Sequence, residues 1–158
     1  MKKIIKTILF LAILLVGYFI FNRYNSTNNV PYFEYFFTNN TVFTKENLYK
    51  NKYTIFVYFS TECNDCKMIN EYLDYFKSKN DNVNFVLVAK GNDTKKLIKF
   101  IDTKKMSNFK GYLLLDKEDN FPSDFALGIS FNYPVIKAYD KNGILLKNIK
   151  TLDDIKKI

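Results

Sequence analysis

Two cysteines, Cys63 and Cys66, are the only thiols of the 158-residue chain, and two residues separate them. At this spacing both thiols fall within one turn of a helix, so a disulfide between them could form and break without unfolding the chain. The thiolate is the reactive form of cysteine. The pair therefore predicts a redox-active dithiol, in which Cys63 attacks a disulfide and Cys66 resolves the mixed disulfide.

The segments on either side of the pair favour reactivity. The β-branched and aromatic run Tyr53–Phe59 predicts a strand buried on both faces. The apolar spacing within Lys67–Lys77 predicts a helix that begins near the cysteines. Thiols at the start of a helix face unpaired N–H groups and the positive end of the helix dipole, which stabilise the thiolate. We therefore expect both cysteines at a strand-to-helix junction.

The composition removes most other chemistry. The chain has no His, so it cannot supply a Ser-His-Asp or Cys-His apparatus of its own. Two thiolates with carboxylates are a poor ligand set for zinc, and two cysteines exclude a disulfide-dense scaffold, so we assign no metal site within the chain. Two other interpretations of the pair stay open: an inert bridge, which would close almost no loop and stabilise little, and half of a metal site between two chains.

The N-terminal residues 1–22 predict a membrane anchor. Lys2, Lys3 and Lys6 precede Thr7–Phe21, a segment without any charged residue. A transmembrane helix needs about 17–25 mostly apolar residues, and Lys6 can extend to the interface. A cleaved signal peptide is the alternative, although the bulky residues after the apolar core suit cleavage poorly. The lysines place the following chain outside the cytoplasm, either held at the cell membrane by a single span or, after cleavage, secreted.

The net charge of +8 comes from 24 basic and 16 acidic residues. Four of the bases belong to the N-terminal segment, and the others are spread along the chain with acids among them. A nucleic-acid-binding protein would need a concentrated basic stripe. We therefore expect no nucleic-acid partner.

Strand-like and helix-like segments alternate over residues 32–158, after a polar linker at 23–31. Apolar, β-branched runs bounded by turn residues predict strands, and apolar residues at helical spacing predict helices. The further expected strands are Tyr32–Phe37, Thr41–Phe43, Val83–Val88, Tyr112–Leu115, Val135–Tyr139 and Ile144–Lys147. The further expected helices are Thr44–Tyr49, Asp93–Ile101, a short one opening at Pro122 and ending before Gly128, and Thr151–Ile158. Parallel βαβ units that end in a hairpin at Asn142-Gly143 imply an α/β domain with one mixed sheet and helices on both faces.

The segments Phe56–Lys67, Phe131–Ile136 and Tyr139–Ile144 together resemble the thioredoxin-like superfamily. Among its members the chain is most similar to the membrane-anchored, extracytoplasmic branch that includes the thiol-disulfide reductases of cytochrome c maturation. The resemblance implies a thioredoxin-like fold over residues 40–158, a cis-proline at Pro134, and a substrate groove formed with Tyr133. It implies no cofactor beyond the Cys63–Cys66 disulfide. Its implied partners are an extracytoplasmic protein that contains a disulfide and a membrane thiol donor.

The chain departs from the family's usual pattern beside the thiols. Glu62 stands where the family often has Trp, and Asp65 lies between the cysteines. Both carboxylates would raise the pKa of the thiols, in opposition to the helix dipole, which favours a reductant over a strong oxidant. The buried acid that some relatives carry six positions before the first cysteine is Val57 here. Proton transfer would therefore need water, Glu62 or another acid.

Three functions are compatible with these patterns. The first is a membrane-tethered, extracytoplasmic thiol-disulfide oxidoreductase that acts as a disulfide reductase. The second is a thioredoxin-like binding module at the membrane surface with a non-catalytic Cys pair. The third is metal delivery by paired chains through Cys63 and Cys66. The redox behaviour of the pair distinguishes the first function from the others.

Overall fold

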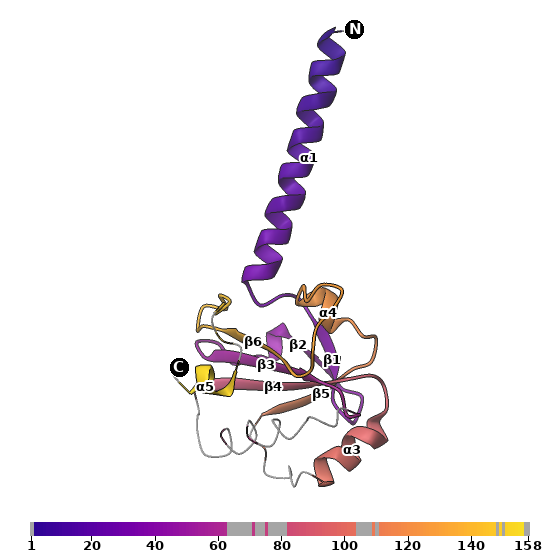
Figure 1. Cartoon of the computed structure of the whole chain (residues 1–158), viewed down its shortest axis with the longest axis vertical. Coiled ribbons are helices and arrows are strands. Elements are labelled where there is room, and N and C mark those ends of the chain that lie inside the picture. The colour runs from indigo at the N-terminus through magenta and orange to yellow at the C-terminus, as the bar shows by residue number, and fades with distance from the viewer. Residues whose placement is uncertain are drawn as a thin grey trace.

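The computed structural model describes residues 2–62, 71, 75, 82–103, 109, 111–147, 149 and 151–156, with the backbone alone at 2–5 and 19–27. The elements in chain order are α1 (Lys2–Asn28), β1 (Glu34–Phe36), β2 (Val42–Thr44), the 3₁₀ helix η1 (Lys45–Asn47), β3 (Tyr53–Phe59), β4 (Val83–Lys90), α3 (Thr94–Thr103), β5 (Tyr112–Asp116), α4 (Phe121–Asp124), β6 (Val135–Tyr139) and α5 (Leu152–Ile155). Figure 1 shows α1 extending away from a domain built around one sheet.

The described strands form one mixed sheet of six, in the order β2-β1-β5-β4-β3-β6. β3 pairs in parallel with β4, and β4 in parallel with β5. The other neighbours are antiparallel, including β6 against β3. The expected strand at 53–59 is confirmed residue for residue, and all of it after Tyr53 is buried. Because the three parallel strands run the same way, the residues that follow them emerge at one end of the sheet.

Two apolar clusters cover the two faces of the sheet. One contains Val57 and Phe59 of β3 together with Leu97 of α3 and Ile155 of α5. The other contains Phe56 and Tyr58 of β3 and is largely aromatic; its further members include Phe33, Tyr35, Phe43, Phe121, Phe125 and Tyr139. Side chains therefore alternate between the faces along β3, as the pleat of a strand requires. The prediction of helices on both faces is confirmed.

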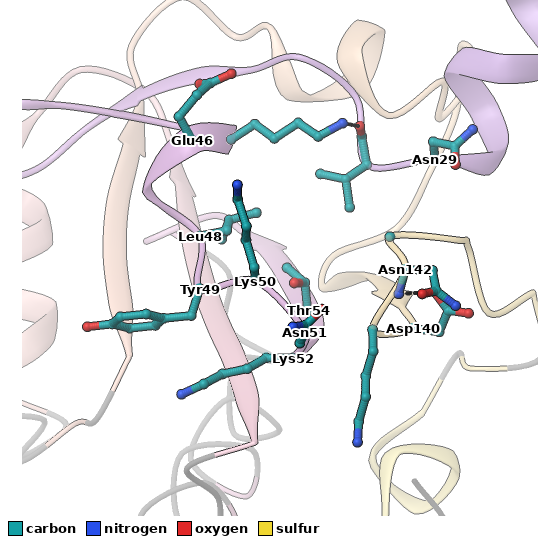
Figure 2. A pocket seen from close by; sticks show the side chains of 14 residues that line it. Asn29, Glu46, Leu48, Tyr49, Lys50, Asn51, Lys52, Thr54, Asp140 and Asn142 are labelled. Atoms are coloured by element: carbon teal, nitrogen blue, oxygen red, sulfur yellow. Dashed lines mark hydrogen bonds between the residues drawn. The ribbon is translucent and has the colours of Figure 1, made fainter.

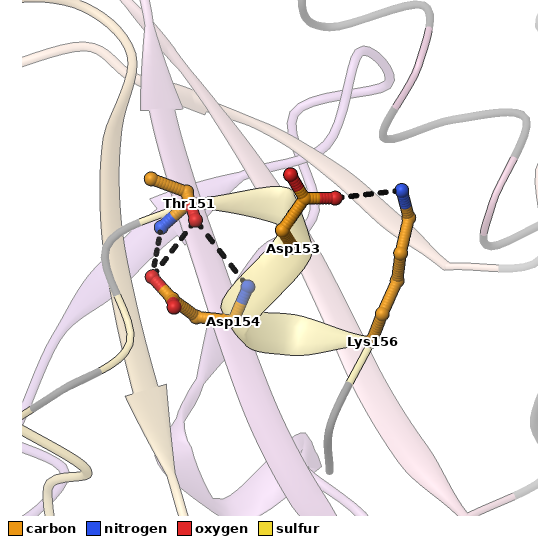
Figure 3. A network of polar contacts seen from close by, with 4 residues as sticks. All are labelled: Thr151, Asp153, Asp154 and Lys156. Atoms are coloured by element: carbon orange, nitrogen blue, oxygen red, sulfur yellow. Dashed lines mark hydrogen bonds and ion pairs between the residues drawn. The ribbon is translucent and has the colours of Figure 1, made fainter.

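Two of the expected helix starts carry side-chain caps. Asp93 accepts a hydrogen bond through Oδ1 from the Lys96 amide at 3.0 Å, at the start of α3. Thr151 and Asp154 form a capping box at α5, in which Thr151 Oγ1 accepts from the Asp154 amide and Asp154 Oδ2 accepts from the Thr151 amide (Figure 3). Each cap satisfies amides that the first turn leaves unpaired.

The predicted strand at Ile144–Lys147 is not formed. The turn at 140–143 is present, but the following residues make only isolated bridges, from Ile144 to Asn29 and from Leu145 to Tyr139. The Leu145 amide donates to the Asn28 carbonyl at 2.7 Å, and the Leu146 amide donates to the Ala138 carbonyl at 2.8 Å. The segment thus divides its contacts between β6 and residues 28 and 29 at the end of α1, which prevents a continuous ladder with β6.

The helix α1 continues to Asn28, into the segment that the sequence predicts as a linker. Val30, two residues after the helix ends, is buried. Its described side chains from Ile8 to Tyr18 are exposed. Within the described part of the chain, no helix combines the length and the apolar character that crossing a membrane requires.

Candidate active site

The predicted thiols, Cys63 and Cys66, lie outside the described residues, as does Asp65 between them. The chain that leads to them is described. β3 ends at Phe59, and Thr61 and Glu62 form a turn in which the Glu62 amide donates to Ser60 Oγ at 3.2 Å. The described chain therefore reaches Glu62, the residue before Cys63, at the end of the sheet where the parallel strands finish.

The segment after the cysteines is described at two positions, Glu71 and Tyr75, and both are helical. Tyr75 packs against the cluster that contains Val57 and Phe59. These observations agree with the predicted helix at Lys67–Lys77, whose other residues lie outside the described part of the chain.

Glu62, the residue before Cys63, forms an ion pair with Lys96 of α3. Lys96 Nζ lies 2.6 Å from Glu62 Oε1, and both side chains are exposed. The hydrogen bond and charge of Lys96 lower the pKa of Glu62, and the same contacts raise the pKa of Lys96. The negative charge that the sequence places beside the thiols is therefore offset by a lysine 34 residues away. Nothing local in the sequence indicates this partner.

Tyr133 and Pro134 lie at the same end of the sheet as Glu62. The peptide bond between Tyr133 and Pro134 is cis, in agreement with the expectation for Pro134. Pro134 directly precedes β6, whose first residue, Val135, pairs with Tyr58 near the end of β3. The Tyr133 ring lies 5.5 Å from the Tyr58 ring. The structure thus places the described residues of the predicted site, Glu62, Tyr133 and Pro134, at the same end of the sheet, next to the neighbouring strands β3 and β6.

A buried group of acids and tyrosines lies beneath this end of the sheet, and the sequence reasoning did not identify it. Asp116, at the end of β5, is 1% exposed and accepts from the amides of Asn120 and Phe121 at 2.8 and 2.9 Å. Tyr35 donates to Asp124 Oδ2 at 2.9 Å. Burial raises the pKa of both carboxyls, against these hydrogen bonds. The sequence signal for this group was Asp116, a charged residue directly after the apolar run of β5.

Tyr58 is the exception within this group. Its hydroxyl is buried and, within the described part of the chain, makes no hydrogen bond of ordinary geometry, although it interacts with the Asp116 carboxyl. Its ring stacks on Phe121 at a centroid distance of 4.3 Å. Burial and the nearby charge of Asp116 raise the pKa of Tyr58. Tyr58 and Val57 point to opposite faces of the sheet, so this group does not occupy the position of the acid that some relatives carry before the first cysteine.

Among the residues described, no cluster of three or more Cys, Asp or Glu side chains is arranged to hold a metal ion.

No family model and no curated protein matches the chain. Solved structures do match it. One is a domain of a possible thiol-disulfide isomerase from Cytophaga hutchinsonii, 19% identical, with a TM-score of 0.64 over 82% of this chain and 89% of that one. A thiol-disulfide oxidoreductase from Bacteroides fragilis is 16% identical, with a TM-score of 0.66 over 82% and 97%. A thiol:disulfide interchange protein of the thioredoxin family from Chlorobium tepidum is 16% identical, with a TM-score of 0.64 over 83% and 92%.

These similarities define the class of fold. The chain has a thioredoxin-like α/β fold with a mixed six-stranded sheet. At these identities the likeness concerns the fold, and the function depends on the site.

Proposed function

We propose that this protein is a thiol-disulfide oxidoreductase that uses Cys63 and Cys66. The observation that carries the proposal is the place of the Cys-x-x-Cys sequence, directly after the end of β3 in a thioredoxin-like fold. Tyr133 and Pro134 support it, because they lie at the same end of the sheet. The structural neighbours that are named thiol-disulfide oxidoreductases support the same chemistry by analogy.

The proposed reaction transfers two electrons to a protein disulfide. The Cys63 thiolate attacks one sulfur of the substrate, which forms a mixed disulfide and releases one substrate thiolate. The Cys66 thiolate then attacks the Cys63 sulfur, which releases the second substrate thiolate and closes the Cys63–Cys66 disulfide. The substrate gains two electrons and two protons, and the protein dithiol loses them. A membrane thiol donor would return the disulfide to the dithiol form.

The proposed direction is reduction. Asp65 lies between the thiols in sequence, and its carboxylate disfavours the thiolate that a strong oxidant must stabilise. The ion pair with Lys96 weakens the contribution of Glu62, so Asp65 carries more of this argument than the sequence suggested. A reduction potential of the Cys63–Cys66 couple near about −270 mV supports a reductant, and one near about −120 mV supports an oxidase.

The test is turnover of a protein disulfide by the full chain with dithiothreitol as the reductant. Cys63→Ser should abolish turnover above the dithiothreitol background, because the attacking sulfur is lost. Cys66→Ser should accumulate a mixed disulfide that mass spectrometry detects, because the resolving sulfur is lost. Lys99→Gln, exposed on α3, is the control and should retain turnover. Unchanged turnover in Cys63→Ser would remove the enzymatic assignment and favour a binding module.

The proposed location is the extracytoplasmic side of the cell membrane, with residues 1–22 as the attachment. The support is the uncharged run Thr7–Phe21 behind three lysines, and the exposure of the apolar side chains from Ile8 to Tyr18. A helix with apolar residues on every side is normally covered, by a protein core or by lipid. Fractionation with the membrane and resistance to extraction by carbonate would support attachment, and recovery in the soluble fraction without cleavage would contradict it.

A further inference from the structure

A pocket opens at the end of the sheet where β3 begins, away from the end that leads to Cys63 (Figure 2). Its volume is about 600 Å³. Asn29 and Val30, the first residues after α1, line one side of it. The segment between η1 and β3 and the turn after β6 line the rest. The pocket therefore lies between the domain and the end of α1.

The lining of this pocket is basic. Lys45, Lys50, Lys52 and Lys141 contribute to it, against two carboxylates, Glu46 and Asp140. The sequence shows no basic stripe, because three of these lysines precede β3 and the fourth follows β6. The antiparallel pairing of β6 with β3 brings Lys141 beside the others.

Both carboxylates of the lining are engaged within the protein. Glu46 Oε2 accepts a hydrogen bond from Thr44 Oγ1 at 2.6 Å. Asp140 Oδ1 accepts from the amides of Asn142 and Ile144 at 2.9 and 2.8 Å. These contacts stabilise turns and direct the carboxylate oxygens to the backbone and to a hydroxyl rather than to a lysine.

The lysines differ in how they are held. Lys45 Nζ donates to the Val30 carbonyl at 2.6 Å, which ties η1 to the chain behind α1. Lys52 and Lys141 lie over the rings of Tyr49 and Tyr53, at 4.6 and 5.6 Å from the centroids. Figure 2 shows the Lys50 side chain extending into the space between the labelled residues. Within the described part of the chain, Lys50, Lys52 and Lys141 form no ion pair.

We propose that this pocket binds the phosphate-bearing headgroup of an anionic lipid. Lysine ammonium groups are compact charges that bind phosphate. The volume exceeds what a bare phosphate fills and lies in the range of sites for small organic ligands, about 300–1,000 Å³. The pocket thus accommodates a phosphate together with the group it esterifies.

The position of α1 favours a lipid over a soluble phosphate ester. The uncharged apolar run of α1 ends at Phe21, and Asn29 at the pocket follows eight residues later. At about 1.5 Å of rise per residue, the helix places the pocket roughly 12 Å beyond Phe21. If the apolar part of α1 enters a bilayer, this distance brings the lysines to the headgroup layer and its surface potential. The domain would then hold the pocket next to the bilayer, with the strands of the sheet running across the direction of α1 (Figure 1).

The test compares vesicles of phosphatidylcholine with vesicles that contain 30% phosphatidylglycerol, using the full chain. Amine acetylation followed by mass spectrometry reports each lysine separately. We expect Lys50, Lys52 and Lys141 to react at least threefold more slowly on the anionic vesicles. Lys95 and Lys99, exposed on α3, are the internal controls and should react equally on both. Addition of 1 M NaCl should remove the difference, because screening weakens exposed charge interactions.

A variant pair separates this pocket from general surface charge. The triple variant Lys50→Gln, Lys52→Gln, Lys141→Gln should reduce partitioning onto the anionic vesicles at least tenfold. The control triple variant Lys95→Gln, Lys99→Gln, Lys117→Gln should change this partitioning less than twofold. Equal losses in the two variants, or equal labelling on the two kinds of vesicle, would overturn the proposal. Full protection by millimolar inorganic phosphate or glycerol phosphate on phosphatidylcholine vesicles would also overturn it, in favour of a soluble ligand.

Discussion

The buried hydroxyl groups of Tyr58 and Tyr35 should respond in opposite ways to the same substitution. Both side chains are 0% exposed and belong to the same aromatic cluster. The Tyr35 hydroxyl donates to Asp124, whereas the Tyr58 hydroxyl makes no hydrogen bond of ordinary geometry within the described part of the chain and only interacts with the Asp116 carboxyl. Replacing either residue with phenylalanine removes one oxygen and keeps the ring. The two variants therefore form a matched pair in which only the state of the hydroxyl differs.

The magnitudes follow from the cost of an unpaired polar group and the value of a hydrogen bond. A buried hydroxyl without a partner costs about 1–3 kcal/mol, so Tyr58→Phe should stabilise the protein by about 1 kcal/mol once the small void is counted. A hydrogen bond to a charged group contributes about 1.5–3 kcal/mol, so Tyr35→Phe should destabilise by about 2 kcal/mol. For a chain of this size 1 kcal/mol corresponds to about 2–4 °C in Tm.

The assay is urea and thermal unfolding of the full chain and both variants at pH 7, followed by far-UV circular dichroism. Tm should rise by about 3 °C in Tyr58→Phe and fall by about 6 °C in Tyr35→Phe. A double variant should show nearly additive changes if the two hydroxyls do not interact. The reasoning is refuted if Tyr58→Phe lowers Tm as much as Tyr35→Phe, since that result would mean the Tyr58 hydroxyl is paired in solution.

Three further predictions concern charge and packing. Burial raises the pKa of Asp124, so the folded protein keeps a proton on this carboxyl at pH values where the unfolded chain has lost it. The contribution of Asp124 to stability therefore falls as pH rises from about 4. Asp124→Asn should make the urea midpoint depend less steeply on pH between about pH 4 and 7. Lys96→Met leaves the carboxylate of Glu62 without its cation, so the thiol pKa of Cys63 should rise and alkylation by iodoacetamide at pH 7 should slow about twofold, with Lys99→Met as the control. Gly111→Ala would place a Cβ 2.7 Å from a backbone oxygen of β4, so it should lower stability by about 2 kcal/mol in urea unfolding; a loss below 0.5 kcal/mol would show that the chain adjusts at no real cost.

Most of the sheet could be predicted from the sequence, because the pattern that indicates each strand is strongly apolar and lies within one short segment. Tyr53–Phe59 is β-branched and aromatic throughout, and the structure places a strand over the same residues. Helix starts are local as well, and the predicted helices begin at Asp93 and Thr151, the two residues that cap α3 and α5. The failed strand at Ile144–Lys147 shows the limit. Its pattern is that of a hairpin arm, but a hydrogen bond to the distant residue Asn28 replaces part of the ladder.

The contacts around the candidate site were less predictable, because they join residues that are far apart in the chain. Glu62 was identified by its place beside Cys63, yet its pairing with Lys96 depends on how α3 packs. Likewise, the lysines are spread evenly along the sequence, which therefore predicts no basic patch. The pairing of β6 with β3 places Lys141 at the same pocket as Lys50 and Lys52. Sequence periodicity reports burial and spacing along one element and carries no information about which elements become neighbours.

The pairing of β6 with β3 has a consequence for biosynthesis. β3 lies inside the sheet, and its antiparallel neighbour comes from the far end of the domain, with Thr54 opposite Tyr139. A chain that emerges from the ribosome N-terminus first cannot complete the sheet around β3 until nearly all of the domain has been made, and non-local pairings of this kind form slowly. Such a chain remains open for longer, which prolongs the time during which chaperones can bind it.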